Sequence, residues 1–300
     1  MTTTIPRVTG LLVIEVRNSN PNGDPDRESD PRTRAHDGRG VISDVSFKRK
    51  LRELVLAKSG PVWQQLKVNL SLDDESFGIH VDQATRDREK AAKGEQKKSL
   101  SGANWDVRVF GSTSLEEGDN FIRTGVAQFS IAVSAAKVRI QRDTNTVKAN
   151  VDASKIADRG MAPLAFRIVE HGVYAMPFLI NPTAASRSGC TLQDTELLCR
   201  LIPYAYAHNP SRIRPLVEVR HAWYFEHASA LGSCSDFAII DSLTPTKASP
   251  EVPSTSWDEY GYDGAKLLAN LKEKYAGKFR HFGDLTDPAF VDATFGRRAT

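Results

Sequence analysis

A short apolar run constrains the fold of this chain most. Residues 9–16 (Thr-Gly-Leu-Leu-Val-Ile-Glu-Val) are apolar and rich in β-branched side chains, and their length suits a buried strand. Residues 18–26 follow after Arg17, and each of them favours turns. The longest apolar stretch, residues 10–14, is far shorter than the roughly 20 residues that span a bilayer. We therefore expect a soluble, cytoplasmic protein without a membrane partner, with a polar loop at the edge of a sheet.

The next predicted element is an amphipathic helix. Ser43 is a suitable N-cap, and Asp44 in the first turn favours the helix dipole. The apolar residues at helical spacing share one face, namely Phe47, Leu51, Leu54 and Val55. Charged residues point away from that face, namely Arg49, Arg52 and Glu53, with Lys48 at the seam. The helix is predicted to reach about residue 58 and to end at Gly60 and Pro61.

Strand and helix patterns alternate along the rest of the chain. Residues 60–103 are predicted to form a partly helical insertion, and residues 137–160 a protruding hairpin with Thr144-Asn-Thr at its tip. The other predicted elements are strands over 121–134, 166–180 (one bent strand or a strand pair) and 214–225, and helices over 192–206 and 264–275, the last after a loop at 245–256. This order is typical of an α+β protein with a ferredoxin-like sheet and large insertions.

Charge and cysteine content narrow the classes of function. Forty Lys and Arg residues against 37 Asp and Glu give a net charge of +3, which is too small to establish a nucleic-acid partner. Four cations within residues 48–52 and an acidic stretch over 258–292 suit a subunit that contacts a polyanion, and equally an ordinary surface. Cys190, Cys199 and Cys234 have no metal-ligand spacing, so we expect reduced and mostly buried thiols.

The polar loop carries two closely spaced carboxylates, Asp24 and Asp26. Counted from Asp24, the positions where a calcium loop needs Gly and Glu are Ser29 and Ala35, so that pattern fails. The two carboxylates form either a metal or general-base pair or a turn that their side chains stabilise. The sequence has no dinucleotide or phosphate-binding glycine motif and no serine-nucleophile elbow, and we expect no cofactor.

Two basic groups are candidates for phosphate binding. Lys48, Arg49 and Arg52 lie within about one helical turn, with Ser46 beside them, so their side chains could contact successive phosphates. The alternative is the solvated face of an amphipathic helix. The predicted hairpin carries Lys137, Arg139, Arg142 and Lys148, which form either a clamp for a nucleic-acid strand or a charged surface loop.

Two segments in combination resemble a known family. Residues 20–26 (Asn-Pro-Asn-Gly-Asp-Pro-Asp) and 40–52 (Gly-Val-Ile-Ser-Asp-Val-Ser-Phe-Lys-Arg-Lys-Leu-Arg) are similar to the backbone subunit of type I CRISPR surveillance complexes, the "Cas seven" family, in the branch of subtypes I-B and I-C. Weaker matches are residues 106–111, 171–174 and 220–226 and the strand with Arg123 and Gln128, where the family's usual Arg-Gly-Pro-Val-Gln is Arg-Thr-Gly-Val-Ala-Gln. The matches cover most of residues 10–243.

The resemblance implies an RNA-recognition-type palm with finger and thumb insertions. Residues 1–59, 106–136 and 166–243 would form the palm, residues 60–105 a finger-like insertion and residues 137–165 the thumb-like hairpin, which splays the guide bases. Residues 244–300 would form a C-terminal extension with a loop and a helix.

The resemblance also implies a function. Copies of a non-enzymatic subunit would polymerise head to tail along a guide (CRISPR) RNA, beside other type I effector subunits, and present it for pairing with target DNA in antiviral defence. RNA contacts are implied for Arg17, Asn20, Asn22, Ser46, Lys48, Arg49, Arg52, Arg108, Arg123, Gln128, Lys137, Arg139, Arg142 and Lys148. One rival hypothesis is a metal-dependent RNA endonuclease of the type III backbone kind that uses Asp24 or Asp26, and another is an oligomeric scaffold without RNA.

Overall fold

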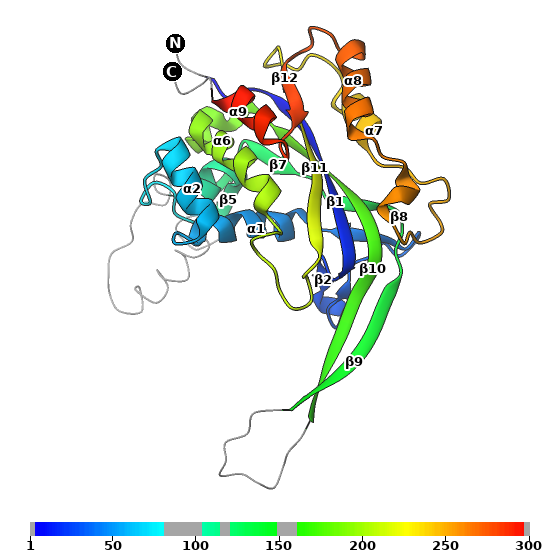
Figure 1. Ribbon diagram of the computed structural model, residues 1–300. Coiled ribbons are helices and arrows are strands. Elements are labelled where there is room, and N and C mark those ends of the chain that lie inside the picture. Colours follow the sequence, from blue (N-terminus) through cyan, green and yellow to red (C-terminus); the bar gives the residue numbers. More distant parts are fainter. Residues whose placement is uncertain (1–3, 81–103, 115–120, 149–160, 297–300) are drawn as a thin grey trace, which may run out of the picture.

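A large antiparallel sheet forms the centre of the protein. The computed structural model describes residues 4–80, 104–114, 121–148 and 161–296. The sheet strands follow the order β12 (Phe279–Asp284), β11 (Val217–His227), β1 (Val8–Ser19), β10 (Met161–Ile180), β8 (Ala132–Lys137) and β4 (Arg39–Ile42), while β7 (Ala127–Phe129) and β9 (Ile140–Lys148) also pair with β10 (Figure 1). Two small ribbons join β2 (Gly23–Asp24) to β3 (Asp30–Pro31) and β5 (Gly111–Ser114) to β6 (Phe121–Thr124).

Apolar residues of β1 alternate between two cores, one on each face of the sheet. Leu12 and Ile14 belong to the first core, on the side that we call face A, and Leu11 and Val13 to the second, on face B. Face A is covered by α1 (Asp44–Leu56), α2 (Pro61–Leu70), α4 (Trp105–Phe110), α6 (Leu192–Leu201) and α9 (Pro288–Phe295). Face B is covered by α7 (Asp236–Leu243) and α8 (Gly264–Lys274). The short elements are α5 (Ala185–Ser188), η1 (Pro25–Arg27), η2 (Pro182–Ala184), η3 (Ile202–Tyr204) and η4 (Trp257–Tyr260).

The predicted amphipathic helix and its N-cap are confirmed in α1. The Ser43 side chain accepts a hydrogen bond from the Ser46 amide, and Phe47 and Leu51 are buried in the first core. The prediction for Gly60 and Pro61 was incomplete. Pro61 is the first residue of α2, where its missing amide costs no hydrogen bond, so the proline begins a second helix of the first core.

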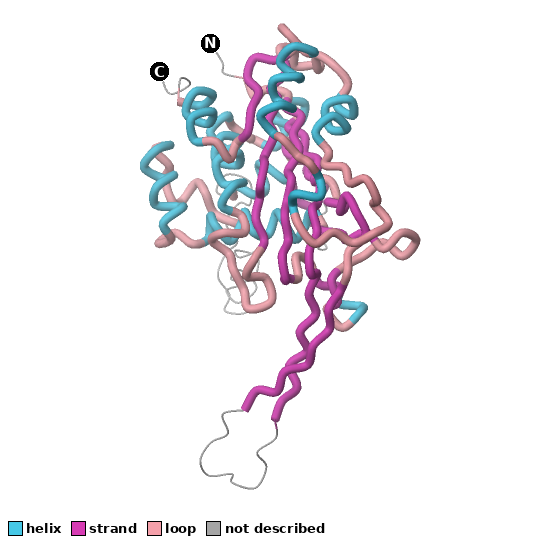
Figure 2. Tube along the Cα trace, turned by 45° about the vertical axis from the view of Figure 1, so that its right-hand side comes forward, coloured by secondary structure: helices cyan, strands magenta, loops and turns pink. Residues whose placement is uncertain are grey.

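One strand links the sheet to the predicted hairpin. Of the two alternatives for residues 166–180, the single strand is confirmed, since β10 is 20 residues long. It pairs with β1 from Val169 to Ile180 and with β9 from Met161 to Val169. The hairpin β9–β10 therefore continues a central strand beyond the body of the protein (Figures 1 and 2). The predicted tip at residues 144–146 was wrong because these residues lie within β9, and residues 149–160 lie outside the described residues.

Another expectation that the structure corrects is the single strand over residues 121–134. This stretch forms three strands, β6, β7 and β8. The break between β6 and β7 falls at Gly125, where a Cβ atom would lie 2.3 Å from the carbonyl oxygen of Val109. A backbone approach this close requires glycine and prevents a straight, continuous strand.

The remaining elements agree with their predicted places within a few residues. Residues 192–206 form α6 and η3, residues 217–227 form β11, and residues 264–274 form α8. All three cysteines are free thiols, with Cys190 and Cys199 buried. None of the helices that the structure describes has the length and hydropathy of a membrane span.

A buried chain of hydrogen bonds ties the segment after α7 to face B. Tyr260 donates to Ser254 Oγ over 2.8 Å, and Ser254 Oγ lies 2.8 Å from His171 Nδ1. His171 Nε2 lies 3.2 Å from Glu15 Oε1. If Nε2–H donates to the carboxylate, Nδ1 accepts from the serine hydroxyl, so every group in the chain is satisfied by a neutral histidine.

Because of this network, the stability of the protein is expected to decrease as the pH is lowered. Burial lowers the pKa of His171 below its ordinary value of 6.5, although Glu15 acts in the opposite direction. Between the two pKa values the unfolded chain binds the proton and the folded chain does not, so stability is lost as the pH falls below about 6.5. Unfolding in urea at a series of pH values should show a weaker pH dependence for His171→Gln over about pH 6.5 to 5.5. An identical dependence in both proteins would contradict this assignment.

Candidate nucleic-acid interface

The first basic group lies on α1, near the loop that precedes it. Lys48 Nζ donates to Asp44 over 2.9 Å, and its side chain is only 13% exposed. Arg49 donates to Glu53 over 2.9 Å but is 77% exposed. Ser46 is partly buried. Of these three side chains, Arg49 is therefore the most accessible to an external phosphate.

Arg52 does not point away from the first core, as the helical periodicity predicted. Its Nε donates to Asp106 Oδ2 over 2.9 Å, and its guanidinium lies 5.2 Å from the centre of the Phe110 ring. The other Asp106 oxygen accepts from the His80 amide. Arg52 thus joins α1 to α4, because the long side chain turns back from the polar face of the helix to a buried carboxylate.

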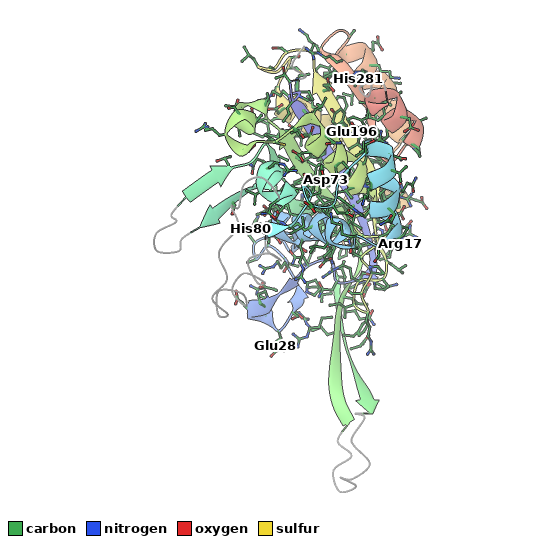
Figure 3. The ribbon with its side chains drawn as sticks, turned by 90° about the vertical axis from the view of Figure 1, so that its left-hand side faces the viewer. Arg17, Glu28, Asp73, His80, Glu196 and His281 are labelled. Carbon is green, nitrogen blue, oxygen red and sulfur yellow. The ribbon has the colours of Figure 1, made fainter. Side chains whose placement is uncertain are left out.

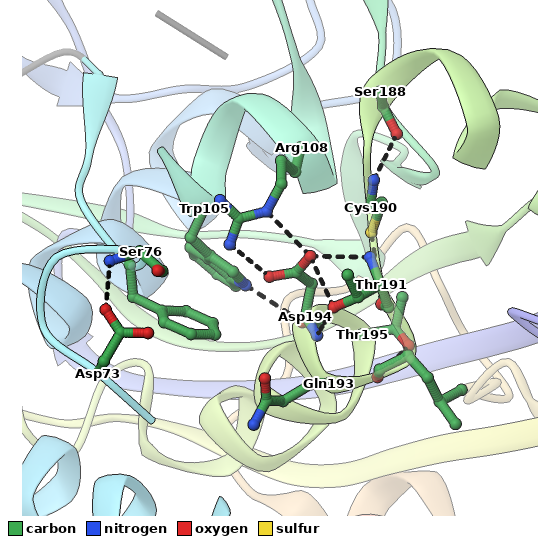
Figure 4. Close-up of polar contacts among 12 residues, drawn as sticks. Asp73, Ser76, Trp105, Arg108, Ser188, Cys190, Thr191, Gln193, Asp194 and Thr195 are labelled. Atoms are coloured by element: carbon green, nitrogen blue, oxygen red, sulfur yellow. Dashed lines mark hydrogen bonds and ion pairs between the residues drawn. The ribbon is translucent and has the colours of Figure 1, made fainter. Parts of the chain in front are cut away.

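Arg108 is also bound inside the protein. Its Nε and Nη2 donate to the two carboxylate oxygens of Asp194 over 3.0 and 2.7 Å (Figure 4). Asp194 is fully buried and forms a capping box with Thr191, which begins α6. Trp105 Nε1 donates to the Asp194 carbonyl over 3.1 Å. This bidentate pair fastens α4 to α6, and Arg108, like Arg52, is bound inside the protein.

The polar loop is shaped by its asparagines. Asn20 is buried and donates to the Ser29 carbonyl over 2.8 Å, while Asn22 Oδ1 accepts from the Ser43 amide over 2.8 Å. Asn22 therefore fixes the loop against the N-terminus of α1. Arg17 is exposed at the end of β1 and donates to Glu15 over 2.7 Å (Figure 3).

Asp24 acts as the N-cap of η1. Its side chain accepts from the Asp26 amide over 3.3 Å, and it lies 3.5 Å from Arg32. The Asp26 side chain is exposed. No cluster of three or more His, Cys, Asp or Glu residues suited to a metal ion occurs in the described ranges 4–80, 104–114, 121–148 and 161–296.

The second basic group lies at the root of the hairpin. Lys137 is exposed, and Arg139 is an exposed residue that donates to Glu170 over 2.6 Å. Arg142 Nη2 donates to Asp30 Oδ2 over 2.6 Å and is 60% exposed. Gln128, on β7, is exposed and donates to the Gly125 carbonyl. Arg123 lies on β6 and Lys148 on β9, but their side chains lie outside the described part of the chain.

Acidic partners are the feature of this interface that sequence reasoning missed. The described cations Arg17, Lys48, Arg49, Arg52, Arg108, Arg139 and Arg142 each lie against a carboxylate. The pairs differ in exposure, from the closed Arg108–Asp194 pair to the open pairs of Arg49 and Arg142. Only the open pairs can exchange their carboxylate for a phosphate without a change in the fold.

The sequence analysis also missed a third group of cationic side chains. A pocket of about 430 Å³ opens where Val133 of β8 meets the loop after α7, and Arg34 and Arg39 line it. Both arginines contact Asp37, and the hydrogen bond from Arg34 lowers the pKa of Asp37 to about 2. The cluster of arginines at positions 32, 34 and 39 is the signal in the sequence that could have indicated it.

Comparison with solved structures defines the class of fold. The structure is similar to a chain of a "CRISPR RNA-guided surveillance complex, pre-nicking", with a TM-score of 0.56, 17% identity, and coverage of 97% of this chain and 99% of that one. It is also similar to a chain of a "CRISPR RNA-guided surveillance complex", with a TM-score of 0.54, 15% identity and the same coverage. The chain therefore shares its mixed α/β fold with subunits of such complexes.

Sequence comparison identifies the family. Residues 6–264 match the family model of CRISPR-associated protein Cas7, and this chain belongs to that family. It is 24% identical over 230 residues, 65% of its length, to CRISPR-associated protein Cas7 of Haloferax volcanii. The chain spans 63% of the length of that relative. The family match extends beyond residue 243, where the motifs recognised in the sequence end.

Proposed function

We propose that this protein is a guide-RNA-binding backbone subunit of a type I CRISPR surveillance complex, in which copies polymerise along one guide. The observation that carries the proposal is the placement of open cations. The side chains of Arg49 on α1 and of Arg139 and Arg142 at the root of the hairpin are exposed, although each pairs with an acid. We propose a cytoplasmic location for the protein. CRISPR RNA and neighbouring effector subunits are the partners that its family and fold support.

The palm is proposed to be ferredoxin-like, of the RNA-recognition type. The order β11-β1-β10-β8, with α1 between β1 and β8 and α6 between β10 and β11 in the chain, supports this proposal. Both helices pack on face A. We further propose residues 1–59, 106–136 and 166–243 as the palm, 60–105 as the finger-like insertion, 137–165 as the thumb-like hairpin and 244–300 as the C-terminal extension.

In this function the protein holds the guide by its phosphates and leaves its bases for pairing with target DNA. Affinity would come mainly from neutralised phosphates and would fall steeply with salt. Phosphate contacts carry no sequence information, so preference for particular guide sequences should be weak. Base pairing between guide and target then supplies the specificity.

The proposal is tested by expressing the chain with a guide array. A large ribonucleoprotein with a high 260/280 nm ratio, whose RNA derives from the guides after nuclease trimming, is the expected result. Polymers that survive RNase treatment and show no nucleic-acid absorbance would indicate a scaffold without RNA and overturn the proposal.

We expect no strand scission by the protein. The side chain of Asp24 is engaged in capping η1. Labelled complementary RNA should therefore stay intact when incubated with the guide-loaded protein and Mg²⁺. Periodic cleavage that Asp24→Ala abolishes would establish the endonuclease instead.

A further inference from the structure

Two arginines lie directly opposite each other at the root of the hairpin. Arg142 of β9 is the register partner of Arg167 of β10. Cross-strand neighbours in an antiparallel pair lie on the same face of the ribbon, and like charges at such positions are destabilising. The hairpin therefore needs an anion between them.

The chain supplies this anion as Asp30, the first residue of β3. Arg142 Nη2 and Nε lie 2.6 and 3.2 Å from Asp30 Oδ2, and Arg167 Nη1 lies 3.5 Å from Asp30 Oδ1. Arg167 also forms an ion pair with Glu28 and donates to the Glu28 carbonyl over 2.8 Å. Figure 3 shows Glu28 on the small ribbon beside the hairpin.

The turn that delivers Asp30 is held in an unfavourable backbone conformation. Glu28 and Ser29 have φ angles of 50° and 67°, so two successive residues other than glycine are left-handed. Such residues cost of order 1–3 kcal/mol each and persist only where the surroundings fix them. Here the Asn20 side chain binds the Ser29 carbonyl, and the Ser29 amide donates to the Asp24 carbonyl over 2.8 Å. Glu28 is also the C-cap of η1, so one of the two left-handed residues ends that short helix and the other places Asp30 beside the hairpin.

The charge pair is open to an external ligand on the Arg142 side. The Arg142 side chain is 60% exposed, whereas the Asp30 side chain is 15% exposed. A phosphodiester offers two oxygens in the geometry that a guanidinium binds best, so it can replace the carboxylate.

We propose that Arg142 and Arg167 form a phosphodiester-binding subsite, which Asp30 fills in the RNA-free protein and from which an RNA phosphate displaces it. This inference rests on the proposed function and adds Arg167 as a ligand and Asp30 as an internal competitor. The competitor keeps the arginine pair neutralised until RNA arrives, and its departure releases the left-handed turn at Glu28 and Ser29.

The test measures binding of a mixed-sequence single-stranded oligoribonucleotide by fluorescence anisotropy at several salt concentrations. Asp30→Asn keeps the shape and one acceptor but removes the competing charge. We expect about fivefold tighter binding at low salt, the change that corresponds to one surface ion pair. The slope of log affinity against log salt should steepen by roughly 0.7, for one further phosphate contact.

Asp26→Asn is the matched control, because Asp26 is an exposed acid of the same turn and its removal changes the net charge equally. It should leave the affinity for RNA unchanged. If it raised the affinity as much as Asp30→Asn does, the effect would come from net charge alone and the proposal would be overturned. The gain in affinity from Asp30→Asn should vanish when Arg142→Gln is added to it. It should persist when Arg49→Ala is added instead.

Two further outcomes separate the hypotheses. If the unmodified chain binds RNA but a folded Asp30→Asn protein binds it equally or more weakly, Asp30 has only a structural role. This inference then fails, while the proposed function stands. If the unmodified chain does not bind RNA, the proposed function fails. If Asp30→Asn does not fold, Arg142→Gln tests the same subsite. We expect it to bind RNA about fivefold more weakly, and an unchanged affinity would overturn the proposal.

Discussion

Replacing Asp194 by alanine is expected to lower the free energy of unfolding by about 3–5 kcal/mol, because it removes the carboxylate that binds a buried guanidinium through two hydrogen bonds. Arg108 is almost fully buried, and two of its hydrogen bonds end on the Asp194 carboxylate. The substitution also removes the half of the α6 capping box in which the Asp194 carboxylate accepts from the Thr191 amide, while Thr191 still caps the helix. Urea unfolding followed by the fluorescence of Trp105 and the other tryptophans would measure the change.

Asp292→Ala is the matched control for this prediction. Asp292 lies 3.6 Å from Arg200, but its side chain is exposed, so its removal should change the free energy of unfolding by less than about 1 kcal/mol. A similarly small effect for Asp194→Ala would show that the Arg108–Asp194 pair does not hold α4 to α6.

The double variant Arg108→Met with Asp194→Leu separates structure from RNA binding. Apolar residues of similar volume often replace a buried ion pair without loss of stability, so this variant should recover most of the stability. If it folds and binds RNA as the unmodified chain does, Arg108 is a structural residue. Loss of RNA binding in the folded double variant would restore the contact that the family resemblance implied.

The difference between Arg49 and Arg52 shows how far sequence reasoning reached. Helical periodicity placed both on the polar side of α1, and it predicted the N-cap Ser43 and the buried Phe47 and Leu51 correctly. Local patterns of this kind depend on residues three or four positions apart. The inward turn of Arg52 depends on Asp106, 54 positions away, and no local pattern contains that information.

The hairpin shows the same limit in the candidate site. Its β-favouring residues and charges predicted a basic projection, and the described parts of β9 and β10 form one. Its acidic partner Asp30 lies 112 positions from Arg142, in a turn that the sequence suggested as a metal site through Asp24 and Asp26. The loop acids are therefore better explained as partners of arginines and caps than as ligands, and this became visible only once the ribbon β2–β3 was placed beside the hairpin.

The largest effect on RNA binding is expected from Lys48→Ala with Arg49→Ala. A hydrogen bond to a charged group contributes about 1.5–3 kcal/mol, so loss of the Arg49 phosphate contact should by itself weaken binding by at least about 10-fold for every RNA sequence. The salt slope should fall by roughly 0.7, the value for one single-strand phosphate contact. Arg49 is expected to account for most of the loss, since Lys48 is held by Asp44 and only 13% exposed.

The fold should survive this double substitution, which makes the binding result interpretable. Each of the two cations pairs with an acid four positions away on α1, and such pairs contribute about 0.3–0.5 kcal/mol. Lys272→Ala with Lys274→Ala is the control. Both lysines are exposed on α8, on face B, and replacing them removes the same amount of charge. Equal loss in both double variants would reduce the effect to net charge. Undiminished binding by the α1 variant would exclude that helix from the guide site and leave the hairpin root as the phosphate-binding surface.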